Sequence, residues 1–180
     1  MNTALLLHDV HGAGGFGSGL LHPLTGPDHL VAMVAVGLWG AQLGKRAAVL
    51  LPVAFPLVMA LGALLGMSGV ALPGVEVGIA ASALLLGLAV LAEWRAPLPL
   101  AVALVAAFAV LHGHAHGTEL PAGEDGLRYS AGFVLSTGLL HAAGIAIGLL
   151  SATPRGRLLV RALGAAVAAV GAVYLWRSLS

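Results

Sequence analysis

A short segment near the N-terminus combines two histidines, an aspartate and two prolines within apolar surroundings. It reads His-Pro-Leu-Thr-Gly-Pro-Asp-His from His22 to His29, with Asp28 beside the second imidazole. Ionisable side chains at the depth of a bilayer are costly, so they usually face a cavity, a partner or an ion pathway. Pro23 and Pro27 lack backbone N–H groups and therefore leave carbonyl oxygens free to bind a cation. The segment is typical of a pathway that carries a metal ion through a membrane.

A second group of candidate ligands ends a later apolar segment. His112, His116 and Glu119 are spaced four and three residues apart, and this spacing places them on one face of a helix. His114 lies between them in the sequence but points away from that face, so we interpret it as a neighbour. Two imidazoles and a carboxylate on one face are hard to explain by packing alone, and they favour metal binding.

The remaining histidines extend these two groups. His22 and His29 are seven residues apart and share a helix face if the helix continues through the prolines. His141 lies in the middle of a later apolar segment, and His8 and His11 lie in the N-terminal tail. Their expected depths predict a path that descends from the outer surface toward the middle of the bilayer. The predicted metal ligands are His8, His11, His22, Asp28, His29, His112, His116, Glu119 and His141.

Simpler structural roles compete with metal binding at single positions. A lone membrane histidine such as His141 is most often a hydrogen-bond partner between helices. Asp28 could cap the helix that follows Pro27, because aspartate is a good N-cap. His8 and His11 could belong to an ordinary solvated tail. These alternatives stay open for the single residues, whereas the two groups taken together favour a metal ion.

The composition places these residues in an integral membrane protein. The 180 residues are 59% hydrophobic and 8% charged, with a mean hydropathy of +1.02 and a net charge of +1, whereas soluble domains carry roughly 25% charged residues. The apolar stretches are long enough for helices rather than barrel strands, and the small net charge argues against a nucleic-acid partner. The chain has no cysteine, which excludes disulfides and thiolate ligands. Nitrogen and oxygen ligands favour nickel, cobalt or zinc over copper(I).

Six hydrophobic segments of about 20 residues predict an all-α, polytopic protein with one membrane domain over residues 1–180. They lie near 15–43, 47–68, 73–93, 97–116, 129–151 and 158–177. Pro23 and Pro27 are expected to break the first of them. Pairs of small residues four positions apart recur along the chain and allow close contact between helices. A homo-oligomer is compatible with the sequence.

Basic residues predict the orientation in the membrane. Six of the eight follow the first, third and fifth segments, so we expect those connections in the cytoplasm and both termini outside. The six are Lys45, Arg46, Arg95, Arg155, Arg157 and Arg161. We therefore expect a multi-pass protein of the inner (plasma) membrane. The first residues have no basic region and only a short apolar run, so they do not resemble a signal peptide.

Two stretches resemble the signatures of a known family. Residues 16–40, FGSGLLHPLTGPDHLVAMVAVGLWG, contain His-Pro, Gly-x-Asp-His, Ala-Met and Val-Gly-Leu-Trp, and residues 111–119, LHGHAHGTE, contain His-Gly-x-Ala-His-Gly-x-Glu. Both patterns are similar to those of the HupE/UreJ family, whose span count also matches over the whole chain. That family consists of nickel or cobalt permeases associated with hydrogenase and urease maturation. The resemblance implies that the functional positions are His22, Asp28, His29, His112, His116 and Glu119.

These observations predict a permease that moves a divalent transition metal ion, nickel first and cobalt next, from outside into the cytoplasm. We expect no enzymatic activity and no required cofactor, with the transported ion and the lipid bilayer as partners. The chain lacks the Gly-x4-Gly-Lys-Ser/Thr motif, so it is not expected to hydrolyse ATP itself. One alternative is an intramembrane zinc-dependent hydrolase, in which three histidines hold zinc and an acid activates water. Another is a haem protein with His29 and His141 as axial ligands.

Overall fold

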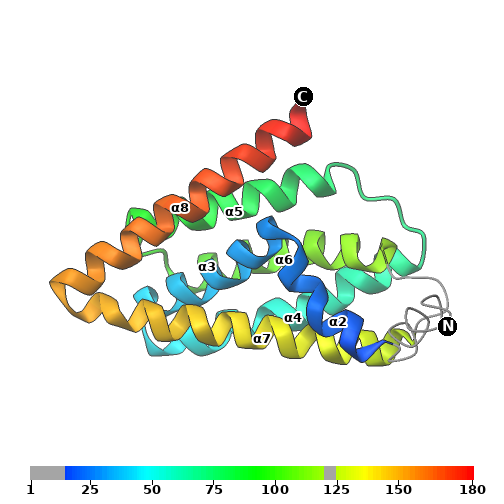
Figure 1. Cartoon of the computed structure of the whole chain (residues 1–180), viewed down its shortest axis with the longest axis horizontal. Coiled ribbons are helices and arrows are strands. Elements are labelled where there is room, and N and C mark those ends of the chain that lie inside the picture. The colour runs from blue at the N-terminus through cyan, green and yellow to red at the C-terminus, as the bar shows by residue number, and fades with distance from the viewer. Residues whose placement is uncertain (1–14, 120–124) are drawn as a thin grey trace, which may run out of the picture.

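The computed structural model describes residues 15–119 and 125–180, and within these ranges the chain is helical without strands. Seven α-helices and one short 3-10 helix follow one another along the chain. They are α2 (Phe16–Thr25), α3 (Pro27–Leu43), α4 (Lys45–Met67), α5 (Val75–Leu91), α6 (Leu98–Thr118), α7 (Gly126–Gly148), η2 (Leu149–Ala152) and α8 (Pro154–Leu179). In Figure 1, α5 and α8 lie along the upper side of the bundle, α4 and α7 lie along the lower side, and α3 runs between them.

Four of the described helices are long and apolar enough to cross a membrane: α4, α6, α7 together with η2, and α8. Helix α5 is apolar but shorter, with 17 residues. The predicted segments therefore correspond to helices, with ends displaced by a few residues. The first segment, 15–43, contains two α-helices, whereas each of the other five segments contains one.

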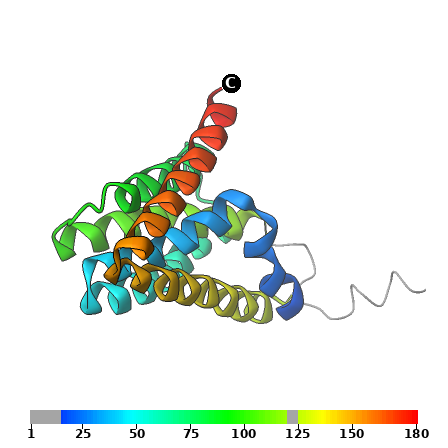
Figure 2. The same ribbon diagram turned by 60° about the vertical axis from the view of Figure 1, so that its left-hand side comes forward.

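The break between α2 and α3 lies at Gly26 and follows from the local sequence. Gly26 has extended backbone angles, φ −97° and ψ 105°, because a residue that precedes proline is disfavoured in the helical region. Pro27 then begins α3, where its missing N–H costs nothing. Figures 1 and 2 show the sharp change of direction between α2 and α3. Pro23 lies inside α2 without ending it.

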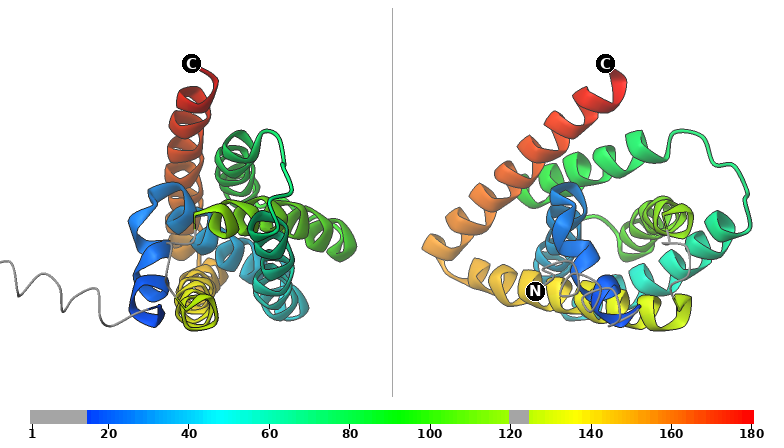
Figure 3. Two further views of the ribbon diagram at one scale, coloured as in Figure 1. Left: turned by 90° about the vertical axis from the view of Figure 1, so that its right-hand side faces the viewer. Right: turned by 45° about the vertical axis from the view of Figure 1, so that its right-hand side comes forward.

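Glycines let the helices approach backbone to backbone. A Cβ atom at Gly113 in α6 would lie 1.9 Å from the carbonyl oxygen of Met59 in α4, and one at Gly37 in α3 would lie 2.2 Å from the carbonyl oxygen of His141 in α7. The same kind of contact joins α5 to α8 at Gly87. The left panel of Figure 3 shows α5 and α8 above α4 and α7. Small residues thus hold together three close helix pairs.

Connections at Gly44, 92–97 and 149–153 lie together at one end of the bundle, on the left in Figure 1. Two arginines there bind the carbonyl ends of helices: Arg95 donates to the carbonyl of Gln42, and Arg161 Nε donates to that of Leu91 over 3.0 Å. Positive side chains are favourable at helix C-termini. This end also carries six of the eight basic residues of the chain.

Many large apolar side chains lie on the surface, and several polar side chains lie inside the bundle. Large apolar side chains such as Leu57, Leu61 and Leu139 are more than half exposed, whereas polar groups are buried. The buried polar residues are Gln42, Ser82, His112, His114, His116, Ser136, Thr137 and His141. An apolar surface around an interior that holds these polar groups suits a lipid environment, in which polar groups face the inside of the bundle.

Candidate metal site

His116 is the meeting point of the predicted ligands. It lies in the last turns of α6 and is 5% exposed. Its ring centroid is 4.8 Å from that of His22 on α2 and 4.7 Å from that of His29 on α3. We expected His22 and His29 to share one helix face if the helix continued through the prolines, but the helix is broken at Gly26. Instead, the two imidazoles approach His116 from two helices.

An outer group of three ligands lies at the C-terminal end of α6. One ligand atom each from His22, His116 and Glu119 all lie within 4.8 Å of one another, and Nε2 of His22 is 3.6 Å from Oε2 of Glu119. Two nitrogen or oxygen ligands on one ion, each at about 2.1 Å, stand at most about 4.2 Å apart. Small side-chain rotations therefore suffice to bring this group around a metal ion. Glu119 is 52% exposed, so the group opens toward the solvent.

An inner pair, His29 and His112, continues the group. Their ring centroids are 4.7 Å apart. Asp28 Oδ1 lies 3.3 Å from Nδ1 of His29, and because a carboxylate only accepts hydrogen bonds, this nitrogen carries the proton. The Nε2 atom of His29 keeps its lone pair, and it is buried without a hydrogen-bond partner among the described residues. A carboxylate behind a histidine is the usual way to orient a metal ligand.

Ser82 on α5 orients the imidazole of His112, as Asp28 orients that of His29, by accepting a hydrogen bond from one ring nitrogen. The Ser82 hydroxyl donates to the carbonyl of Ile79 over 2.7 Å, so its oxygen accepts from Nε2–H of His112 over 2.9 Å. This leaves the lone pair on Nδ1 of His112, which is buried and has no hydrogen-bond partner in the described part of the chain. Sequence reasoning missed Ser82. A serine inside an apolar helix was the available signal.

Both ring nitrogens of His116 are also buried without hydrogen-bond partners among residues 15–119 and 125–180. Buried polar groups are rarely left unpaired, since each lost hydrogen bond costs about 1–3 kcal/mol. The donor set at this junction thus consists of imidazole lone pairs and two carboxylates. This chemistry fits a divalent nickel, cobalt or zinc ion.

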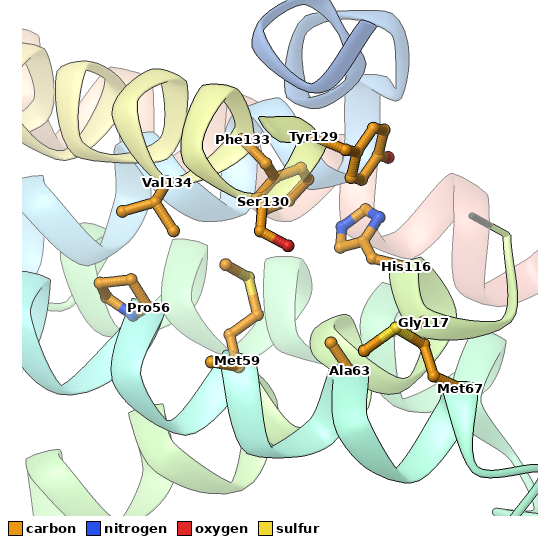
Figure 4. Close-up of a pocket in the computed structure, with 11 residues that line it drawn as sticks. Pro56, Met59, Ala63, Met67, His116, Gly117, Tyr129, Ser130, Phe133 and Val134 are labelled. Atoms are coloured by element: carbon orange, nitrogen blue, oxygen red, sulfur yellow. The ribbon is translucent and has the colours of Figure 1, made fainter. Parts of the chain in front are cut away.

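One side of His116 borders a small cavity of about 60 Å³ between α4, α6 and α7. Figure 4 shows Tyr129 and Phe133 of α7 above the imidazole, and Met59 rising toward them from α4. The Phe133 ring centroid is 4.2 Å from that of His116. The lining is mostly apolar, so this side of the imidazole makes packing contacts.

The other predicted ligands lie apart from this junction. His141 on α7 contacts the ring of Phe55, whose centroid is 5.4 Å from that of His141 and 5.6 Å from that of His112. Both ring nitrogens of His141 are buried without a hydrogen-bond partner among the described residues. The predictions for His8 and His11 lie outside the described residues.

Two competing structural roles have clear outcomes. His114 points away from the junction, as the helical spacing predicts, and its Nε2 lies 2.7 Å from the carbonyl oxygen of Val70 in the α4–α5 connection. The capping role for Asp28 is wrong, because Gly26 holds the N-cap position of α3 and no side chain caps it. Asp28 instead faces His29 from within the first turn.

The comparisons with known proteins agree with the two sequence signatures. The family model described as HupE / UreJ protein matches residues 1–174. Protein HupE of Rhizobium leguminosarum bv. viciae is 45% identical over 158 residues, which cover 88% of this chain and 83% of that protein. No solved structure matches the chain, and the hydrolase alternative gains no support from these matches. The two matches, each over most of the chain, establish that it belongs to the HupE/UreJ family.

Proposed function

We propose that this protein is a permease that moves nickel, or next cobalt, from outside into the cytoplasm. One observation carries the proposal: the imidazoles of His22 on α2 and His29 on α3 converge on His116 of α6. Membership of the HupE/UreJ family, whose members are commonly nickel/cobalt transport accessory proteins, supports it.

The ligands suit the dehydration that transport requires. An aquated cation must exchange water for protein ligands before it enters a region of low dielectric constant. Four imidazoles offer nitrogen ligands, and the carboxylates of Glu119 and Asp28 lie at the two edges of the group. Two negative charges balance a divalent cation, so the loaded site has little net charge to stabilise in the membrane.

The proposed arrangement in the membrane follows from the basic end of the bundle. We place this end in the cytoplasm, by the positive-inside rule, in a single inner-membrane domain with both termini outside. Helices α2 and α3 together then form the first of six crossings. The outer group at Glu119 faces the outside and receives the ion, and His29 and His112 take it deeper.

The test is nickel uptake into proteoliposomes, with cobalt and zinc as competitors. We expect saturable uptake by the wild type and loss of uptake in His29→Ala and His116→Gln, since each substitution removes one imidazole ligand from the group around His116. His114→Gln is the matched control on the same helix, because its side chain points to Val70, and we expect it to retain uptake. Wild-type protein that binds nickel but never transports it would overturn the permease proposal.

A further inference from the structure

One face of α7 leads from the outer histidines to His141. Tyr129, Phe133, Thr137 and His141 are spaced four residues apart and therefore lie on one side of the helix. At one end of this row, Phe133 contacts the His116 ring, and at the other end His141 contacts Phe55. Thr137 thus lies on α7 between the histidine junction and His141.

The Thr137 hydroxyl is an unusual group to find at this position. The side chain is 0% exposed, and Oγ1 has no hydrogen-bond partner among the described residues. A threonine in a helix commonly donates to the carbonyl of the preceding turn, but Thr137 does not. A buried hydroxyl oxygen of this kind is available as a ligand.

A backbone carbonyl is available beside His141 for a different reason. Pro56 lacks the N–H that would bond to the carbonyl of Pro52 in an unbroken helix, and both prolines lie inside α4. The carbonyl of residue 52 in a helix lies beside residues 55 and 56, and the Phe55 ring contacts the His141 imidazole, so the freed carbonyl belongs to the part of α4 that packs against His141. Backbone carbonyls freed within membrane helices coordinate cations in transporters.

We propose that His141, the hydroxyl of Thr137 and the carbonyl of Pro52 form a second, inner cation site beside Phe55, whose ring also contacts His112. This inference rests on the proposed function, because the inner site receives the ion from His29 and His112. One imidazole and two neutral oxygens suit the same class of divalent transition metal ion. The inner site uses no carboxylate, whereas Glu119 and Asp28 accompany the four histidines around His116, so it binds the ion more weakly. Weak binding at the inner site favours release toward the cytoplasm.

Phe55 packs against histidines of both sites. Its ring is 0% exposed, and its centroid lies 5.6 Å from that of His112 and 5.4 Å from that of His141. In this proposal the ion passes the Phe55 ring on its way from His112 to His141.

Nickel binding to the purified full-length chain, measured by equilibrium dialysis, tests the inner site. In the His116→Gln background, which weakens the outer junction, we expect one weakly bound ion to remain. Adding Thr137→Val removes the hydroxyl at nearly constant volume and lowers this affinity roughly 10- to 100-fold. Adding Thr137→Ser, which restores a hydroxyl, recovers binding relative to valine. Ser136→Ala is the matched control, because it removes the adjacent buried hydroxyl from a different face of α7.

Uptake by the single variant Thr137→Val, measured beside wild type in proteoliposomes, separates the two proposals. We expect it to fall while tight binding at the outer junction persists. Thr137→Val could leave the affinity for the weakly bound ion unchanged, or Ser136→Ala could lower that affinity equally. Either result would overturn the inner site even if the wild type transports nickel. A wild type without uptake would overturn the permease proposal, and the dialysis measurement would still decide whether the inner site exists.

Discussion

The α5/α8 pair and the junction of α2, α3 and α6 differ in what they contain. Both regions include helices that glycines bring close together, but only the junction also gathers histidines. In the α5/α8 pair, Gly87 and Gly171 bring regular helices together backbone to backbone through an apolar interface. At the junction, a broken helix brings His22 and His29 to His116. The difference indicates that close glycine packing stabilises both regions, whereas unpaired polar groups are concentrated where they can bind an ion.

The largest expected effect tests what the two regions share. In Gly113→Ala, the new methyl group would lie 1.9 Å from the backbone oxygen of Met59. Overpacking of this kind typically costs about 1–3 kcal/mol, and here a backbone must move. We expect a large loss of thermal stability in detergent. Gly138→Ala is the control, since a methyl group there meets no atom within 4 Å; equal stability of the two variants would contradict the packing argument.

The next effect concerns charge, which distinguishes the junction from the α5/α8 interface. Asp28→Asn keeps the size of the side chain and an acceptor oxygen for His29, but removes one of the two charges that balance the ion. We expect nickel affinity to fall roughly 10- to 100-fold, as measured by equilibrium dialysis. Arg161→Gln at the opposite end of the bundle serves as the control. An Asp28→Asn protein with wild-type affinity would show that the carboxylate has no part in binding.

The break at Gly26 is the third difference between the regions. Pro27→Ala lifts the restriction on Gly26, so α2 and α3 can join into one helix and draw His22 away from His116. We expect about tenfold weaker nickel binding with every ligand residue still present. Pro154→Ala is the matched control, because Pro154 also begins a helix, α8, whose start is held by the Thr153 side chain. Similar losses in both variants would contradict the role of the break.

The smallest effect comes from Ser82, which lies on α5 but reaches the junction. Ser82→Ala removes the acceptor for Nε2–H of His112, so the proton can move to the nitrogen that we expect to bind metal. We predict a few-fold loss of affinity, on the weak side of the roughly 10- to 100-fold range for groups behind a metal ligand. Nitrogen NMR of the histidine rings should show a mixed tautomer at His112. Ser82→Thr should restore the wild-type spectrum, and an unchanged spectrum in Ser82→Ala would sink this assignment.

Local patterns of the sequence predict the helices and part of the candidate metal site. Hydropathy predicted the helices, and the spacing of His112, His116 and Glu119 predicted their common face. The convergence of His22 and His29 on His116 was beyond such reasoning, because it depends on the direction that α3 takes after Gly26. Ser82 and Phe55 were missed for a similar reason: their roles come from contacts between helices that lie far apart in the sequence.

The most direct test of the central claim is X-ray absorption spectroscopy of the nickel-loaded protein. If the imidazoles of α2, α3 and α6 hold one ion together, the spectrum will show scattering from at least two imidazole rings, at metal–nitrogen distances of about 2.1 Å. His116→Gln will then lower the imidazole count, and His114→Gln will leave it unchanged. A shell made only of oxygen atoms, or one indifferent to His116→Gln, would contradict a metal site at this junction.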